Sequence, residues 1–183
     1  MPSDTTDEET TEDGPETPQD TGPETALIGF IESVLSVPFD ELDTTTTITG
    51  PEPTPAQQLR SLVADADAAV GVLPALPASL LESVGGVDGL RASVVLTGAA
   101  RQRLDGPALS LVESRLADAS VTVYGHDGDS PIGLFLLDET VVCAAFDAAG
   151  DPTALVVSRA PELRAWVGET CSRYRDEADV LIE

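Results

Sequence analysis

The sequence predicts an α/β fold with one mixed sheet, in which helix-linked strands come first, an antiparallel meander follows and a C-terminal helix closes the domain. Three observations support this fold class. Helical patterns alternate with short apolar runs up to about residue 120. Further apolar runs then follow one another across brief polar turns, a spacing typical of neighbouring antiparallel strands. The last pattern begins at Pro161 and has one apolar helical face. This order of elements is typical of a mixed sheet covered by helices.

Residues 1–23 are predicted to be a disordered acidic tail. After the first Met they contain only Ser, Thr, Pro, Gly, Gln, Asp and Glu. Such a segment buries too little apolar surface to offset the entropy lost on ordering.

Residues 24–37 are predicted to form an amphipathic helix that stops before Pro38. Its apolar stripe follows helical spacing and consists of Leu27, Phe30, Ile31, Val34 and Leu35. Residues 38–53 are expected to be a polar linker. The stripe therefore has two possible roles, which are packing on the chain's own domain or forming an interface with a partner or a second copy.

Residues 54–183 are predicted to form the α/β domain. Thr54 can cap its first helix, with Pro55 at the first helical position and Gln57 completing a capping box. The following elements are expected, in order, as a strand over 68–73, a helix over 77–84, a strand over 92–96, a helix over 107–117, strands over 121–124, 132–137, 141–146 and 154–157, and a helix from Pro161 with an inward face of Leu163, Trp166, Val167, Thr170, Cys171 and Tyr174.

The charge pattern predicts a saline environment. The chain has 33 acidic residues, nine arginines and no lysine, which gives a formal net charge of −24, and no cation precedes Arg60. Self-repulsion of this size weakens a compact fold in dilute buffer but is screened in molar salt, where the Debye length is about 3 Å. We expect a cytoplasmic protein of a salt-in halophile, such as a haloarchaeon; the alternative is an ordinary acidic protein with an acidic tail.

The acidic N-terminus lacks the basic start of a secretory signal, and no apolar run predicts a membrane span.

Several segments of the domain resemble archaeal transcription regulators. They are the strand residues 93–97, 121–124 and 154–158, the hairpin Ile132-Gly-Leu-Phe-Leu-Leu-Asp138 with 141–145, the turn 147–150, and Ala165-Trp166 with Tyr174-Arg175. Over about residues 56–180 the chain is similar to the C-terminal effector domains of regulators of the methanogenesis-regulator and TrmB-like type. The resemblance implies a phospholipase D-like fold and a role in sensing metabolites or in dimerisation.

The chain departs from this family before residue 54. Such regulators carry an N-terminal winged helix-turn-helix, whose recognition helix presents Arg or Lys to DNA phosphates. Here a tail, one helix and a linker without cations are predicted instead. We therefore expect no direct nucleic-acid binding. We expect the chain to act as a homo-oligomer or through a protein partner, such as a DNA-binding regulator.

Catalytic chemistry is not expected. A phospholipase D-like hydrolase needs a His-x-Lys signature, but Gly128 stands two residues after His126, the only histidine, and lysine is absent. No Gly-x-Ser-x-Gly elbow supports a serine hydrolase either. His126 lies in a polar turn, where the simplest reading is a surface histidine.

No metal or cofactor is expected. Asp127 and Asp129 resemble part of a calcium loop, but the distal glutamate of such a loop is missing. Cys143 and Cys171 fall in apolar patterns and are expected to serve packing rather than zinc binding.

A small-molecule site is predicted where parallel strands end, because ligands of open α/β sheets collect at the carboxyl ends of the strands. The candidate ligand-binding residues are Thr97, His126, Asp127 and Arg159, with Arg159 supplying a cation for an acidic metabolite. Solvated loops are the alternative reading. The functional hypotheses are a non-enzymatic sensor or dimerisation domain, a metabolite-binding or hydrolytic enzyme using these loops, and a structural partner that assembles through its N-terminal helix.

Overall fold

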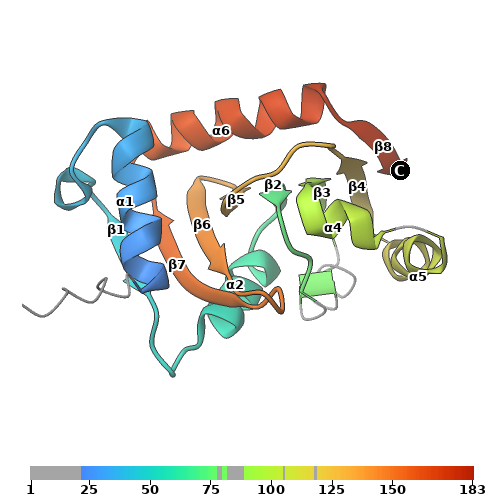
Figure 1. Cartoon of the computed structure of the whole chain (residues 1–183), viewed down its shortest axis with the longest axis horizontal. Helices are drawn as coiled ribbons and strands as arrows, with labels where there is room; N and C mark the ends of the chain where they lie inside the picture. Colours follow the sequence, from blue (N-terminus) through green and yellow to red (C-terminus); the bar gives the residue numbers. More distant parts are fainter. Residues whose placement is uncertain (1–21, 78–79, 82–88, 105, 118) are drawn as a thin grey trace, which may run out of the picture.

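The computed structural model describes residues 22–77, 80–81, 89–104, 106–117 and 119–183, which form an eight-stranded mixed sheet between two layers of helices (Figure 1). The strands are β1 (Thr45–Ile48), β2 (Ala68–Leu73), β3 (Arg91–Leu96), β4 (Ser120–Gly125), β5 (Gly133–Leu137), β6 (Thr140–Phe146), β7 (Pro152–Ser158) and β8 (Asp179–Ile182). The helices are α1 (Pro23–Leu35), the 3-10 helix η1 (Phe39–Glu41), α2 (Pro55–Ala64), α4 (Gly98–Arg103), α5 (Pro107–Leu116) and α6 (Pro161–Asp176).

The topology confirms the predicted fold class. The strand order is β1-β7-β6-β5-β2-β3-β4-β8. The helix-linked strands β2, β3 and β4 pair in parallel, whereas β5, β6 and β7 form an antiparallel meander that joins them through β2. The two edge strands, β1 and β8, are both antiparallel to their neighbours.

Two hydrophobic cores form because successive strand residues point to opposite faces of the sheet. Within β2, Val72 packs on the side of α1 and α6, and Leu73 packs on the side of α2, α4 and α5. Figure 1 shows α1 and α6 over one face of the sheet and α2 and α5 over the other. Both faces of the central strands are thus buried, which explains their continuous apolar runs.

The start of α2 agrees with the prediction. The backbone N–H of Gln57 donates to Thr54 Oγ1 at 3.2 Å, and the N–H of Thr54 donates to Gln57 Oε1 at 3.0 Å. Pro55 occupies the first helical turn. This capping box satisfies two backbone donors that a helix start otherwise leaves unpaired.

The predicted linker over 38–53 is wrong, because it contains η1 and the edge strand β1. β1 pairs antiparallel with β7, where Thr45 lies opposite Ser158 and their hydroxyl oxygens are 2.7 Å apart. The β-branched threonines of this segment suit a strand, but only the distant β7 provides the pairing. The folded body therefore begins well before residue 54.

The stripe of α1 packs on the chain's own sheet. Leu27 and Ile31 are buried against β6, β7 and α6, and the ring of Phe30 contacts Trp166 edge-on with centroids 6.1 Å apart. Val34 and Leu35 are partly buried on the same helix. The expectation that this stripe forms a partner interface is wrong for Leu27 and Ile31, because their side chains have almost no surface exposed to solvent.

Other differences from the predicted elements are small. Residues 1–21 of the predicted tail lie outside the described residues, and α1 already begins at Pro23. Most of the helix predicted over 77–84 is also outside them, although Leu80 and Leu81 are helical. α4 and β8 were not predicted. None of the helices described is long and apolar enough to cross a membrane.

Candidate functional site at the strand ends

The carboxyl ends of β2, β3 and β4 meet at one edge of the sheet. The strand register aligns Leu73, Leu96 and Gly125. Backbone hydrogen bonds continue this alignment into the loops, because the N–H of Thr97 donates to the Leu73 carbonyl at 3.0 Å and that of His126 donates to the Leu96 carbonyl at 2.9 Å. The carboxyl ends of these three parallel strands therefore lie side by side.

Thr97 is a buried positioning residue at this edge. Its side chain is fully buried, and Oγ1 donates to the Leu73 carbonyl oxygen at 3.4 Å. The hydroxyl thus links the ends of β2 and β3 within the protein. Thr97 was predicted to contact a ligand, but its side chain has no exposed surface through which to do so.

The turn after β4 rests against the start of α4 at Gly98. Gly98 has a φ of +48°, and a Cβ at this position would collide with the carboxylate of Asp129. Its N–H also donates to the Gly128 carbonyl at 3.2 Å. Only glycine combines this backbone conformation with so close an approach.

His126 is held by contacts to both ring nitrogens. Nδ1 accepts the backbone N–H of Gly128 at 2.9 Å, so the neutral ring carries its proton on Nε2. Nε2 lies 3.4 Å from Glu177 Oε2 and donates to it. The ring also contacts Tyr174 edge-on, with centroids 4.8 Å apart. His126 therefore joins the β4–β5 turn to the end of α6.

Tyr174 makes a second link between these elements. Its hydroxyl donates to the Asp129 carbonyl oxygen at 2.9 Å, and the guanidinium of Arg173 lies 6.0 Å from the centre of its ring. These residues surround a hollow of about 190 Å³, lined by His126, Gly128, Asp129, Arg173, Tyr174 and Glu177. The hollow presents one cation, two acids and an aromatic ring, which suits a small polar molecule with both hydrogen-bond donors and acceptors.

The predicted residues Asp127 and Arg159 are placed differently. Asp127 is exposed in the same turn but does not line the hollow. Arg159 lies at the opposite ends of the strands. It follows Ser158, which pairs with Val141 at the start of β6. The start of β6 pairs with the end of β5, and the end of β5 pairs with the start of β2 at Ala69. There its Nε donates to Thr140 Oγ1 at 3.3 Å. Arg159 therefore does not belong to the site of His126.

Five residues of this hollow were not predicted as site residues, namely Gly128, Asp129, Arg173, Tyr174 and Glu177. Three of them lie in or directly after α6, and the helical pattern assigned Tyr174 to its apolar face. The pattern does not show where the helix ends relative to the sheet. A tyrosine at the last turn of an apolar stripe, followed by charged residues, was the available signal.

The two cysteines are buried on facing elements and act as packing residues, as predicted. Burial raises the pKa of Cys143 to about 12, with a further increase from neighbouring Cys171. Burial likewise raises the pKa of Cys171 to about 12, against a lowering effect of Arg175. Both thiols therefore stay protonated at neutral pH and are poor nucleophiles or metal ligands. Within the described ranges, no group of three or more His, Cys, Asp or Glu side chains is arranged to hold a metal ion.

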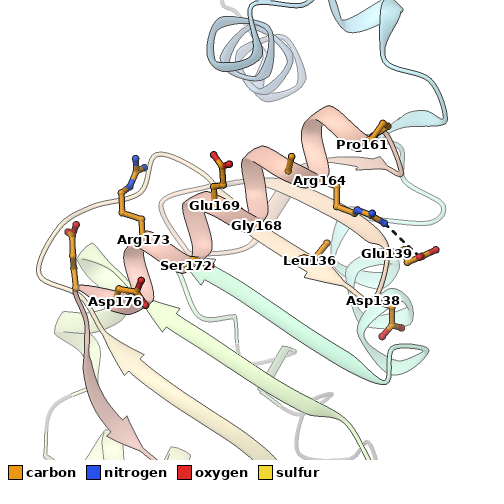
Figure 2. Close-up of a pocket in the computed structure, with 12 residues that line it drawn as sticks. Leu136, Asp138, Glu139, Pro161, Arg164, Gly168, Glu169, Ser172, Arg173 and Asp176 are labelled. Atoms are coloured by element: carbon orange, nitrogen blue, oxygen red, sulfur yellow. Dashed lines mark ion pairs between the residues drawn. The ribbon is translucent and has the colours of Figure 1, made fainter.

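A wider surface extends from this hollow along α6. An open depression of about 1070 Å³ follows the helix and shares Arg173 and Glu177 with the smaller hollow (Figure 2). At its other end, Arg164 reaches Glu139 with 3.8 Å between Nη1 and Oε1. Both side chains of this pair are well exposed, so the pair contributes little to stability. The strand-end hollow is thus continuous with an exposed helix face.

Comparison with known proteins identifies the regulator family. The family model of the middle domain of methanogenesis regulatory protein FilR1 matches residues 53–177, which is more than half of the chain. No curated protein sequence matches the chain.

Solved structures agree on the fold. Nuc from Salmonella typhimurium, a phospholipase D family member, is similar with a TM-score of 0.60 and 14% sequence identity, over 76% of this chain and 99% of Nuc. NucT from Helicobacter pylori is similar with a TM-score of 0.59 and 9% identity, over 75% of this chain and 98% of NucT. TrmBL2, an archaeal chromatin protein described with a novel mode of DNA binding, has a TM-score of 0.53 and 14% identity, over 82% of this chain and 60% of TrmBL2.

At these identities the structural likeness shows a phospholipase D-like fold and no more, whereas the family model places the chain among regulators. The chain belongs to the family of the middle domain of methanogenesis regulatory protein FilR1.

Proposed function

We propose that the chain is a non-enzymatic effector domain, which influences transcription by binding a small molecule or a protein partner. The match of residues 53–177 to the middle domain of a regulatory protein carries this proposal. The packing of α1 and β1 onto the common sheet supports it, since the described residues ahead of α2 then belong to the same body and do not form a separate DNA-reading module.

The absence of lysine from the sequence argues against hydrolysis on this fold. The His-x-Lys signature of phospholipase D chemistry needs a lysine to hold the phosphate, and the chain has none. The single histidine has both ring nitrogens engaged, by Gly128 and by Glu177. We therefore expect no activity on bis(p-nitrophenyl) phosphate, measured by nitrophenol release. Turnover that is lost in His126→Ala would support the enzyme hypothesis instead.

The strand-end hollow is the proposed place of ligand binding. Arg173 offers a cation to an acidic group, and Asp129 and Glu177 offer acceptors to hydroxyl or amino groups. A ligand there would touch both the β4–β5 turn and the last turn of α6. The same helix lines the open depression drawn in Figure 2. Ligand binding in the hollow could therefore shift α6 and alter the binding of a partner along that helix.

A thermal-shift screen tests this site. Sugar phosphates and nucleotides would be added in molar KCl to the wild type, Arg173→Ala and Arg159→Ala. The last variant is a matched control, because it removes an arginine from the opposite edge of the sheet. We expect at least one compound to raise the melting temperature of the wild type and of Arg159→Ala but not that of Arg173→Ala. Equal shifts in all three proteins, or none in the wild type, would contradict the assignment.

A further inference from the structure

A cavity whose described walls are aliphatic lies between the sheet and α5, on the sheet face opposite α1 and α6. It is lined by ten leucine and valine side chains and by no polar side chain among the described residues. The sheet contributes Leu73, Val94 and Leu96, α5 contributes Val112 and Leu116, and the short helical segment at Leu80 closes another side.

The cavity is large enough for a ring-sized molecule. The centres of water-sized spheres have about 40 Å³ available inside it. The wall lies one water radius beyond the space open to these centres. For a spherical space, the void is then about 7 Å in diameter, which is roughly the size of a six-membered ring. Cavities with aliphatic walls stay dry and accept apolar guests, because a water inside would find no hydrogen-bond partners.

One wall of the cavity reaches the protein surface. Most of the lining side chains are buried, whereas Leu76, Leu81 and Val94 are only partly buried. These three side chains are the part of the described wall nearest to solvent, so we expect an apolar molecule to enter past them rather than through the sheet. Filling the void would recover the dispersion contacts that its walls now lack.

We propose that this cavity binds a small apolar ligand, of the size of an aromatic ring or a short branched alkyl chain. The inference rests on the proposed effector role and gives that role an apolar ligand at a second site. The cavity is directly connected to the strand ends, because Leu73 and Leu96 line it and the next residue after Leu96 is Thr97. The hydroxyl of Thr97 bonds the Leu73 carbonyl, so a shift of either leucine moves the loops that carry the strand-end hollow.

Fluorine NMR of the full chain with fluorobenzene tests this site. We expect saturable line broadening in the wild type and a rise in melting temperature with the same saturation. Val94→Phe, which places a ring in the void, should weaken fluorobenzene binding about tenfold or more. Val112→Leu fills less of the void, so it should also weaken binding while straining the core less. Leu111→Ala is the control, since Leu111 is 58% exposed on the same helix and does not line the cavity.

The polarity of the probe separates this site from the strand-end hollow. 4-Fluorophenol should bind about tenfold more weakly than fluorobenzene, because its hydroxyl would be buried without a partner. No saturable binding of fluorobenzene, equal binding of both probes, or unchanged binding in Val94→Phe and Val112→Leu would overturn the inference. Arg173→Ala should leave fluorobenzene binding unchanged, so failure of the polar site and failure of the apolar site are distinguishable.

Discussion

At the scale of single residues, a few side chains join segments that are distant in the sequence. Gly98 admits the carboxylate of Asp129, and His126 and Tyr174 tie the β4–β5 turn to α6. Each of these contacts depends on the backbone around it rather than on the residue type alone. This is why the sequence predicted His126 as a site residue but did not pair it with Tyr174 and Glu177.

Substitutions at two glycines, one crowded and one open, test the close approach of Asp129 to Gly98. Gly98→Ala should lower the free energy of unfolding by about 1–3 kcal/mol, because φ is +48° and the new Cβ meets Asp129. Gly29→Ala in α1 should instead raise it by about 0.5–1 kcal/mol, because nothing lies within 4 Å of the new Cβ and alanine favours a helix. Chemical denaturation at fixed salt measures both. A neutral Gly98→Ala would contradict the close approach of the turn.

The buried thiols predict a pH effect with a definite sign. The pKa of both cysteines is raised from 9.0 to about 12 in the folded chain. Their contribution to stability is therefore fully present below about pH 9 and is lost as the pH rises from there towards 12. At pH 8.5 iodoacetamide should label both cysteines in denaturant and neither in the folded protein, as read by mass spectrometry. Equal labelling rates in the two states would show that the thiols are accessible.

At the scale of elements, local patterns were predictable and long-range pairings were not. The strand over 68–73 was predicted with the bounds that β2 has, and the meander β5–β7 was predicted because its turns are short and its strands adjacent in sequence. β1 and β8 are short edge strands, and each pairs with a strand far away in the sequence or across a helix. Their four residues carry no periodicity strong enough to mark them.

The role of α1 as part of the core predicts a large effect of one substitution. Ile31→Ala should cost about 2–5 kcal/mol of unfolding free energy, because Ile31 is completely buried against β6, β7 and α6. Ile28→Ala is the matched control in the same helix, since Ile28 is only partly buried and should cost much less. Urea denaturation distinguishes them. Equal and small effects would mean that α1 is not packed on the sheet in solution.

At the scale of the whole molecule, the net charge of −24 predicts a strong dependence on salt. The free energy of unfolding should rise as KCl increases from about 0.1 M to about 2 M, because screening reduces repulsion among the acidic groups. Denaturation curves at a series of salt concentrations measure this. Stability that is independent of salt, or falls with it, would contradict the prediction of a protein suited to a saline cytoplasm.

The whole candidate site was predictable only in part, for a reason that lies in the topology. The carboxyl ends of parallel strands must share an edge, so Thr97 and His126 were placed together from the sequence. Arg159 was placed with them as well, but it follows an antiparallel strand and therefore lies at the other edge. The direction of β7 decides at which end of the strands Arg159 lies. That direction depends on the antiparallel pairing of β5 with β2, which the residues of the two strands do not indicate.

The most direct test of the central claim is a gel-shift experiment in molar KCl, with the purified chain and promoter fragments enriched by chromatin capture. An effector domain that acts through a ligand or a partner predicts no sequence-specific shift by the chain alone. Tight binding to one promoter, resistant to competitor DNA, would contradict the account and show that the chain reads DNA itself.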